Sequence, residues 1–351
     1  MEKKLKIAFF NFTQTTVERG AEVFVSELSK RFKKNHVVTI FSDSNKLIPR
    51  VPFLWRFYID FQGIQILLFT IDHIKEVIRE KYDVVIPLNG GWQVVLLKVV
   101  TWFYGGKMII SGQSGKGWDD RNNVLIFPDC FVSLSTSLKA WAKKINPFIK
   151  VEYIPNGVDL TRFHPDGSKI NIRLEKPIIL CVGALTTEKR IDLVIKAVSE
   201  LEKGSLLVVG DGSLKDQLTD LGKNVLGKKF LLTKSKFKDL PKYYREADLF
   251  TLPSPSYRSF EIVIVEAMAS NLPVVVNDDP IRKEIVGDAG LFVDPKDEGK
   301  YVKVLEEALK KKWGDKPRKQ AEKFSWDEIA RKYEKLFVEL IDSRRRKYSI
   351  T

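Results

Sequence analysis

A glutamate within an apolar stretch is the first residue that could take part in chemistry. Residues 249–253 predict a short buried strand, residues 254–259 a polar loop and residues 260–270 a helix, in which Glu266 lies. The free backbone N–H groups of a helix N-terminus bind anions. A carboxylate about one and a half turns into the helix can accept hydrogen bonds from the hydroxyls of a ribose. The alternative is a solvated glutamate on a helix face.

A lysine after a predicted strand is the second candidate. Residues 177–182 read as a strand that ends in Gly183, and Lys189 follows just before a predicted helix at 191–201. Residues 206–209 predict another strand, which ends in a turn at Gly210. A cation at a strand end, close to a helix N-terminus, suits the two charges of a diphosphate.

These segments resemble the retaining GT-B enzymes of glycosyltransferase family 4, as in archaeal and bacterial group 1 glycosyltransferases. Phe260 and the run Glu266-Ala267-Met268-Ala269 match the family's donor-binding segment. Gly183 and Lys189 match its diphosphate-binding segment, and Gly210 a neighbouring turn. Gly20, at the start of a predicted helix, is similar to a glycine that approaches the donor phosphate. The resemblance covers nearly all of residues 3–340 and is strongest in 151–290.

The resemblance implies which residues bind the donor and which depart from the family. It assigns the ribose to Glu266 and the diphosphate to Lys189 and to the helix start at Phe260, Glu261 and Ile262, with Lys189 and Glu266 as the catalytic residues. Arg258 stands where the family has a glutamate beside the donor sugar, and Glu261 where it has a glycine. Two interpretations of Arg258 remain open. It either pairs with Glu261, or faces an acidic donor sugar or an anionic acceptor.

A glycine-rich loop in the first half of the chain is the candidate acceptor site. It follows the predicted strand at 107–111, and open α/β sheets bind ligands at the carboxyl ends of their strands. Its polar side chains are Gln113, Asp119, Asp120 and Arg121, which we expect to line the acceptor pocket. An ordinary surface loop is the alternative. The donor-contacting histidine of many family members has no counterpart here.

Strands and helices alternate in both halves of the chain, which predicts an α/β protein with parallel sheets covered on both faces. The resemblance implies the GT-B fold, two Rossmann-like domains facing a cleft. We expect an acceptor-binding domain at 1–165 and a nucleotide-sugar-binding domain at 166–325, with residues 165–176 as the linker. Residues 326–351 would form a helix that returns to the first domain, followed by a basic tail at 344–347.

Composition limits the partners. The net charge of +14 favours anionic partners such as nucleotide phosphates or an acidic membrane surface. The aromatic-rich stretch 51–69 fits either a membrane surface or a core helix. The chain has no uncharged run of roughly 18 apolar residues, and its two cysteines lie in apolar stretches. We therefore expect a cytoplasmic protein, peripheral at the inner membrane face. The basic residues lack the aromatic interleaving of a nucleic-acid groove, so no nucleic-acid partner is expected.

The function predicted is transfer of a sugar, with retention, from a nucleotide-diphosphate-sugar to a hydroxyl of a glycan, a lipid or a small molecule. No cofactor is expected, and no metal, because the paired aspartates lack the spacing of metal ligands. One alternative is a GT-B nucleotide-sugar epimerase or hydrolase. Another, motivated by Arg258 and Glu261, is a nucleotide-sugar-binding protein without turnover.

Overall fold

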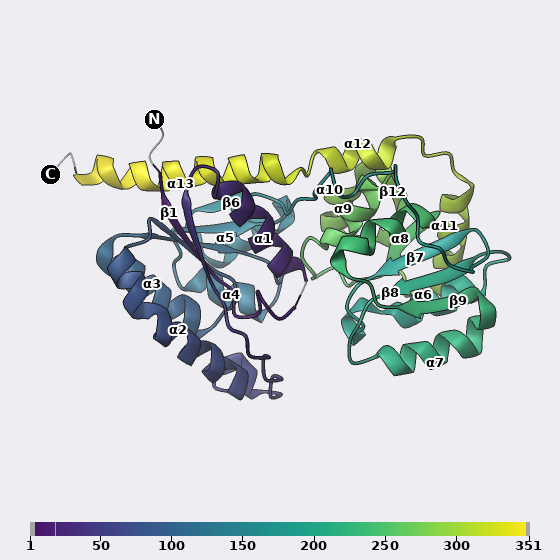
Figure 1. Ribbon diagram of the computed structural model, residues 1–351, viewed down its shortest axis with the longest axis horizontal. Coiled ribbons are helices and arrows are strands. Elements are labelled where there is room, and N and C mark those ends of the chain that lie inside the picture. The colour runs from purple at the N-terminus through teal and green to yellow at the C-terminus, as the bar shows by residue number, and fades with distance from the viewer. Residues whose placement is uncertain (1–3, 18, 349–351) are drawn as a thin grey trace. The chain divides into compact units, whose positions relative to one another are not determined.

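The computed structural model describes the backbone of residues 4–17 and 19–348 and divides the chain into two compact units (Figure 1). The first unit comprises Met1–Asn156 and Trp326–Thr351, and the second Gly157–Ser325. Each unit contains a six-stranded sheet whose strands all pair in parallel. The expected α/β class and the two Rossmann-like domains are therefore confirmed.

The first sheet has the strand order β2-β1-β3-β4-β5-β6. Its strands are short runs rich in β-branched and aromatic residues, and most of their side chains are buried, as in a sheet covered on both faces. They are β1 (Lys6–Phe10), β2 (Val37–Phe41), β3 (Val84–Pro87), β4 (Lys107–Ser111), β5 (Cys130–Ser133) and β6 (Val151–Tyr153).

Helices connect these strands, and the last helix of the chain completes the first unit. They are α1 (Gly20–Phe32), η1 (Leu54–Phe57), α2 (Phe61–Glu80), α3 (Trp92–Tyr104), α4 (Trp118–Leu125), α5 (Thr136–Ile145) and α13 (Trp326–Tyr348). None of the helices in the described part of the chain is long and apolar enough to cross a membrane.

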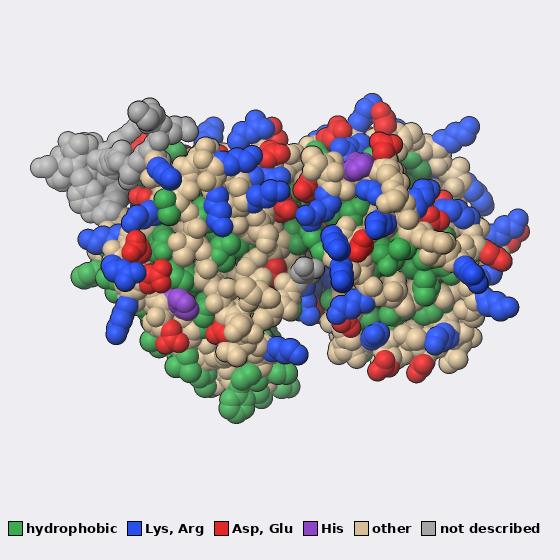
Figure 2. Space-filling view, viewed as in Figure 1, with side chains coloured by type: hydrophobic (Ala, Val, Ile, Leu, Met, Phe, Trp, Pro, Cys, Tyr) green, Lys and Arg blue, Asp and Glu red, His purple; other side chains and the backbone are tan. Residues whose placement is uncertain are grey.

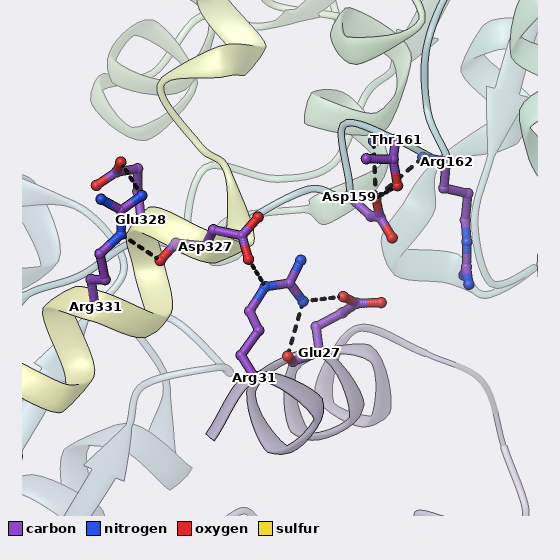
Figure 3. Close-up of polar contacts among 8 residues, drawn as sticks. All are labelled: Glu27, Arg31, Asp159, Thr161, Arg162, Asp327, Glu328 and Arg331. Carbon is purple, nitrogen blue, oxygen red and sulfur yellow. Dashed lines mark hydrogen bonds and ion pairs between the residues drawn. The ribbon is translucent and has the colours of Figure 1, made fainter. Parts of the chain in front are cut away.

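Helices α1 and α13 are held together by aromatic rings and by one arginine. The ring of Phe24 lies 5.8 Å from that of Tyr333. Arg31 donates from Nε to Asp327 at 2.7 Å and from Nη1 to the carbonyl and the carboxylate of Glu27 (Figure 3). These contacts fix the last helix to the first unit. The basic run 344–347 falls within α13, but its side chains lie outside those that the structure describes.

The second sheet has the order β12-β11-β10-β7-β8-β9. Its strands are β7 (Ile178–Val182), β8 (Ser205–Val209), β9 (Phe230–Thr233), β10 (Leu249–Leu252), β11 (Val274–Asn277) and β12 (Gly290–Val293). The longer helices are α6 (Ile191–Ser199), α7 (Lys215–Leu226), α8 (Leu240–Glu246), α9 (Ile262–Ala269), α10 (Pro280–Val286), α11 (Glu298–Lys310) and α12 (Lys316–Glu322). Short 3-10 turns are η2 (Thr187–Lys189), η3 (Gly227–Lys229), η4 (Phe237–Asp239) and η5 (Gly287–Ala289).

The boundary between the units lies at residues 156/157 rather than at 165/166. Asp159 caps a turn by accepting from the backbone of Thr161 and Arg162 (Figure 3), and the buried ring of Phe163 follows. Arg318 donates to the carbonyl of Phe163 at 2.7 Å. Residues 157–165 are therefore part of the second unit because its side chains satisfy their backbone groups.

The stretch expected to be a linker is likewise attached to the second unit. Arg245, at the end of α8, donates to the carbonyls of His164 and Ser168, both at 2.9 Å. Residues 165–176 therefore do not separate the domains, and the expectation of a linker there is wrong. The chain passes between the units after Asn156 and again after Ser325.

The aromatic stretch 51–69 does not form a single element. Phe69 and Ile66 are buried in the core of the first unit, as the core interpretation expects. Phe53, Phe57 and Phe61 are exposed, in or beside η1 and at the start of α2. The core interpretation is wrong for this first part, because only the later turns of α2 direct their aromatic side chains to the sheet.

Candidate functional site

Lys189 lies at the end of η2, and its ammonium group is held by Glu261 of the loop before α9. The Nζ atom is 2.8 Å from Oε1 and 2.5 Å from Oε2 of that carboxylate. Both side chains are mostly buried. The structure therefore brings together two predicted donor-binding residues, and they neutralise each other.

The two predicted glycines of this region keep the neighbouring turns close together. Gly183 follows β7 and donates its N–H to Val209, and Gly210 follows β8 and donates to Thr233. A Cβ atom on Gly210 would lie 2.0 Å from the carbonyl oxygen of Gly183, so no larger residue fits there without a shift. The turn at Gly183 in turn packs against the stem of Lys189. Both glycines position the lysine.

Glu261 is the residue before α9 and has a left-handed backbone, with φ at 56°. This conformation costs a non-glycine residue roughly 1–2 kcal/mol. Burial by itself raises the pKa of Glu261, but the charges of Lys189 and Arg282, with the hydrogen bonds from Lys189, lower it overall. The residue is therefore ionised, and it carries a negative charge at the N-terminus of α9, where the helix dipole favours one.

Arg282 is a site residue that the sequence reasoning missed. It is only 1% exposed, on α10, and donates from Nη1 to the carbonyl of Arg258 at 2.9 Å. Its Nη2 lies 3.8 Å from Glu261 Oε1 and has no hydrogen-bond partner among the described residues. The available signal was a cation three residues after Asp279, which follows a strand and caps α10. A buried guanidinium with a free N–H is a donor for an anion.

Arg258 does not pair with Glu261. Its guanidinium forms an ion pair with Glu188 of η2, whereas the Glu261 carboxylate is occupied by Lys189 and Arg282. The pairing interpretation is therefore wrong. Although Arg258 and Glu261 are only three residues apart, the fold places a residue of η2 beside each of them, and each side chain pairs with that residue instead. That Arg258 faces a donor sugar or an anionic acceptor stays a prediction.

Glu266 lies inside α9 and is almost fully buried. The hydroxyl of Tyr244 donates to its Oε2 at 2.9 Å. Burial raises the pKa of Glu266 to about 7, against the effects of Tyr244 and Arg162. One carboxylate oxygen is thus fixed by the protein, so Glu266 is not a solvated glutamate.

At the start of α9, the side chains of the two apolar residues predicted to bind the donor are buried. Helix α9 begins at Ile262, and the ring of Phe260 is buried against Phe324, at 5.4 Å between centroids. Ile262 is also buried. Phe260 and Ile262 can therefore contact a ligand through backbone atoms rather than through side chains.

A cavity of about 100 Å³ lies in the first unit, at the carboxyl end of its sheet. Gln113, Asp119 and Asp120 line it, so the structure brings together three of the four predicted acceptor residues. Arg121 is exposed and is not among the lining residues. Further lining residues, which were not predicted from the sequence, include Arg50, Trp55, Tyr58, Asn89 and Trp92.

The two aspartates of this cavity have different environments. Asp119 accepts from the hydroxyl of Tyr58 at 2.9 Å and lies 3.5 Å from Arg50. Asp120 is buried and accepts from the backbone N–H groups of Gly115 and Ser114. Burial raises the pKa of Asp120 to about 7. Asp120 therefore holds the glycine-rich loop in shape, and Asp119 presents its carboxylate to the cavity.

Gly20 begins α1 in the first unit, as expected. Two residues on, the carboxylate of Glu22 is buried and accepts from the hydroxyl of Thr13 at 2.5 Å. The loop between β1 and α1 is thus tied to the first turn of the helix. The contact of Gly20 with a donor phosphate stays a prediction.

Comparison with known families gives a match for the second unit. Residues 165–326 match the family described as "Glycosyl transferases group 1". The region contains Lys189, Glu261, Glu266 and Arg282, and it begins close to the start of the second unit.

Proteins similar to this chain in other organisms include several named as glycosyltransferases. An uncharacterised glycosyltransferase of Methanocaldococcus jannaschii is 33% identical over 225 residues, 57% of this chain and 57% of that protein. A GDP-mannose-dependent mannosyltransferase of Mycolicibacterium smegmatis, acting on a phosphatidylinositol monomannoside, is 29% identical over 190 residues, 48% of this chain and 49% of that protein. The chain thus spans about half the length of these curated relatives.

Solved structures share the fold over nearly the whole chain. A sucrose-phosphate synthase from Thermosynechococcus elongatus has a TM-score of 0.79 at 20% identity and covers 97% of this chain, with 100% of its own chain aligned. Anabaena HepE, in complex with UDP-glucose, has a TM-score of 0.73 at 14% identity, over 97% of this chain and 100% of its own. At these identities the similarity establishes the GT-B fold.

Proposed function

We propose that the chain, whose residues 165–326 match the family described as "Glycosyl transferases group 1", is a metal-independent, retaining hexosyltransferase of family 4. It moves a sugar from a nucleotide-diphosphate-sugar to the hydroxyl of a glycan, a lipid or a small molecule. The observation that carries this proposal is the cluster of Lys189 and the buried Arg282 at the N-terminus of α9. Fixed cations and helix N–H groups stabilise charge on a leaving diphosphate.

The proposal gives Glu261 a specific part in donor binding. Its carboxylate takes up the charge of Lys189 that the diphosphate would use. A donor phosphate therefore binds by displacing this carboxylate from the lysine. The free Nη2 of Arg282 is the group through which the exchange can begin, because it has a proton to donate before Lys189 is released.

The other predicted residues take the remaining parts of the substrates. Glu266 binds the ribose through the carboxylate oxygen that Tyr244 leaves free. In the first unit, the carboxylate of Asp119 accepts hydrogen bonds from hydroxyls of the sugar acceptor, and the amide of Gln113 can donate or accept them. Family resemblance implies that the leaving phosphate deprotonates the acceptor hydroxyl, so no protein nucleophile is assigned. An Arg258 that leaves Glu188 for the donor would favour an acidic sugar.

The second candidate function is a nucleotide-sugar-binding protein without turnover. The ion pair between Lys189 and Glu261 favours it, because a stable pair would oppose donor binding. An epimerase or hydrolase of the same fold is a further alternative. Product analysis separates the three, since a hydrolase releases free sugar without an acceptor, an epimerase converts the donor, and a binding protein does neither.

A thermal-shift panel of nucleotide-sugars tests the proposal. UDP-glucose and GDP-mannose are the first members, because HepE has been solved in complex with UDP-glucose and the mannosyltransferase above is GDP-mannose-dependent. A donor at about 100 times its dissociation constant adds roughly 2.7 kcal/mol of stability. We expect one nucleotide class to raise the melting temperature. No shift with any nucleoside diphosphate or its sugars contradicts the proposal.

A further inference from the structure

Helix α2 of the first unit carries a stripe of exposed apolar side chains. The exposed positions are Phe61, Ile64, Leu68, Ile71 and Ile78. Their spacing of three, four and seven residues places them on one face of the helix. The same helix buries other residues in the core, so it is apolar on two sides. A soluble surface helix normally has one such side.

Helix α3 lies against α2 and carries a second exposed stripe. Trp102 is 76% and Phe103 is 82% exposed, and Trp92 and Val99 precede them on the same face. No charged residue occurs at these positions, and the single charged residue of α3, Lys98, pairs with Asp129. The two stripes and η1 form what we call the α2–α3 face. An apolar surface of this extent marks an interaction site.

The face continues at its η1 end into exposed aromatic residues with cations. Phe53 and Phe57 are exposed in or beside η1. Figure 2 shows hydrophobic side chains gathered at one tip of the first unit. The exposed Arg50 and Arg56 stack on the ring of Trp55 at 5.2 and 6.0 Å. Aromatic rings with arginines are the groups that lie well at a membrane–water interface.

The charges of the face fit anionic headgroups. Lys75 falls in register with the α2 stripe and Arg56 precedes its start, whereas the nearby Arg50 lies 3.5 Å from the carboxylate of Asp119. The acidic residues Asp72 and Glu76 lie one position beyond the stripe, on its side rather than within it. A partner must therefore cover a broad apolar area and supply negative charge beside it, which a bilayer with anionic lipids does.

The cavity with Asp119 opens beside the same face. Arg50, Trp55 and Trp92 belong to its lining, and Arg50 and Trp92 are also exposed. The hydroxyl of Tyr58 and the carboxylate of Asp119 provide polar groups inside it. A polar cavity next to an apolar surface suits an amphiphile, whose hydroxylated head enters the cavity while its tail stays in the membrane.

We propose that the α2–α3 face docks on an anionic bilayer and that the adjoining cavity takes the hydroxylated head of a lipid-linked acceptor. The second half of this proposal rests on the proposed function, because it names the acceptor class for the sugar transfer. The first half stands on the exposed face alone.

Vesicle co-sedimentation tests the docking. The probes are vesicles of phosphatidylcholine alone and of an equimolar mixture with phosphatidylglycerol, at low and high salt. We expect the chain to bind the anionic vesicles, less so as salt rises. The double variant Trp102→Glu/Phe103→Glu places two carboxylates on the face and should weaken binding by at least about tenfold. Circular dichroism confirms that this variant is folded.

Phe148→Glu is the matched control. Phe148 is 86% exposed, in the loop between α5 and β6, and belongs to neither helix. This variant should bind vesicles like the wild type. The docking is overturned if the wild type does not sediment at low salt, or if both variants lose binding equally. It is also overturned if the face instead joins two copies, seen as a dimer that the double variant converts to a monomer.

Octyl glucoside below its micelle concentration tests the cavity. It should raise the melting temperature of the wild type, whereas glucose at the same concentration should not, and Asp119→Ala should abolish the shift. Equal shifts in wild type and variant contradict the acceptor assignment. A failure of this proposal can be told apart from a failure of the proposed function. Binding of vesicles and of octyl glucoside does not require a nucleotide-sugar, and binding in the nucleotide panel requires neither vesicles nor glycoside.

Discussion

The two units present opposite kinds of site at the carboxyl ends of similar sheets. In the second unit, Lys189 and Glu261 form a mostly buried ion pair, and the buried Arg282 lies 3.8 Å from the same carboxylate. In the first, Asp119 and Tyr58 line a cavity bordered by exposed aromatic residues. A buried cation needs a partner of opposite charge even when no ligand is bound, because the desolvation of an unpaired buried charge costs several kcal/mol of folding free energy. A site for neutral hydroxyls can stay open, so the difference follows from the charge of the ligand that each unit is proposed to bind.

The largest expected effect is that of Lys189→Ala on nucleotide binding. The loss of a charge-assisted hydrogen bond to phosphate should cost about 1.5–3 kcal/mol, and the unpaired Glu261 carboxylate should add repulsion. Calorimetry with the nucleotide that shifts the melting temperature measures it. Lys196→Ala is the control, since Lys196 is an exposed lysine of α6. Unchanged affinity in a folded Lys189→Ala protein would mean that the charge cluster is purely structural.

Glu261→Gly is expected to tighten nucleotide binding by roughly tenfold, about 1.4 kcal/mol. The substitution removes the carboxylate that competes with phosphate for Lys189, and glycine accepts the left-handed φ of 56° without strain. Glu261→Gln removes the charge but keeps the strain, and should give part of the gain. Weaker binding by both variants would show that the carboxylate instead positions Lys189 for the donor.

Glu266→Ala should raise the dissociation constant of a nucleotide by roughly fivefold, about 1 kcal/mol, through lost ribose hydrogen bonds. Glu266→Gln should do nearly the same, because an amide accepts at one end only. Binding of octyl glucoside should not change, as that probe belongs to the first unit. Tyr244→Phe, which retains the carboxylate, controls for the loss of its partner. If both Glu266 variants bind the nucleotide as tightly as the wild type, Glu266 does not contact the ribose and has only a structural role.

The smallest expected effect is a dependence of stability on pH, to which each unit contributes one carboxyl. Burial raises the pKa of Asp120 from an ordinary value of 3.8, and that of Glu266 from 4.5, to about 7. Between these values the folded state binds more protons than the unfolded state, so the free energy of unfolding falls as pH rises, and levels off above about 7. Asp120→Asn and Glu266→Gln should each flatten this fall.

Urea denaturation between pH 4 and 8, in steps of about one pH unit, measures this pH dependence of the free energy of unfolding. The two substitutions should act additively because they lie in separate units. An unchanged slope in both variants would show that neither carboxyl is held protonated by its burial.

Several features of the site could be predicted from the sequence because residues close to them in the sequence determine them. The strand before Gly183, the strand before Gly210 and the helix that contains Glu266 all follow from local apolar patterns and turn residues. The loop with Gln113 and Asp119 was placed at a cavity because it follows a strand of a parallel sheet. Arg282 could not be assigned in this way, because its partners come from other loops.

The pattern of this sequence determined the alternation of strands and helices, and with it two parallel sheets, since short β-branched runs separated by amphipathic helices have few other ways to bury their apolar faces. Tertiary structure decided which charges meet. Arg258 and Glu261 are three positions apart, yet each pairs with η2, because folding places η2 beside the start of α9. Tertiary structure also decided that α2 and α3 carry exposed apolar residues. The periodicity of a sequence identifies an apolar stripe on a helix, but it does not show whether another part of the protein covers that stripe.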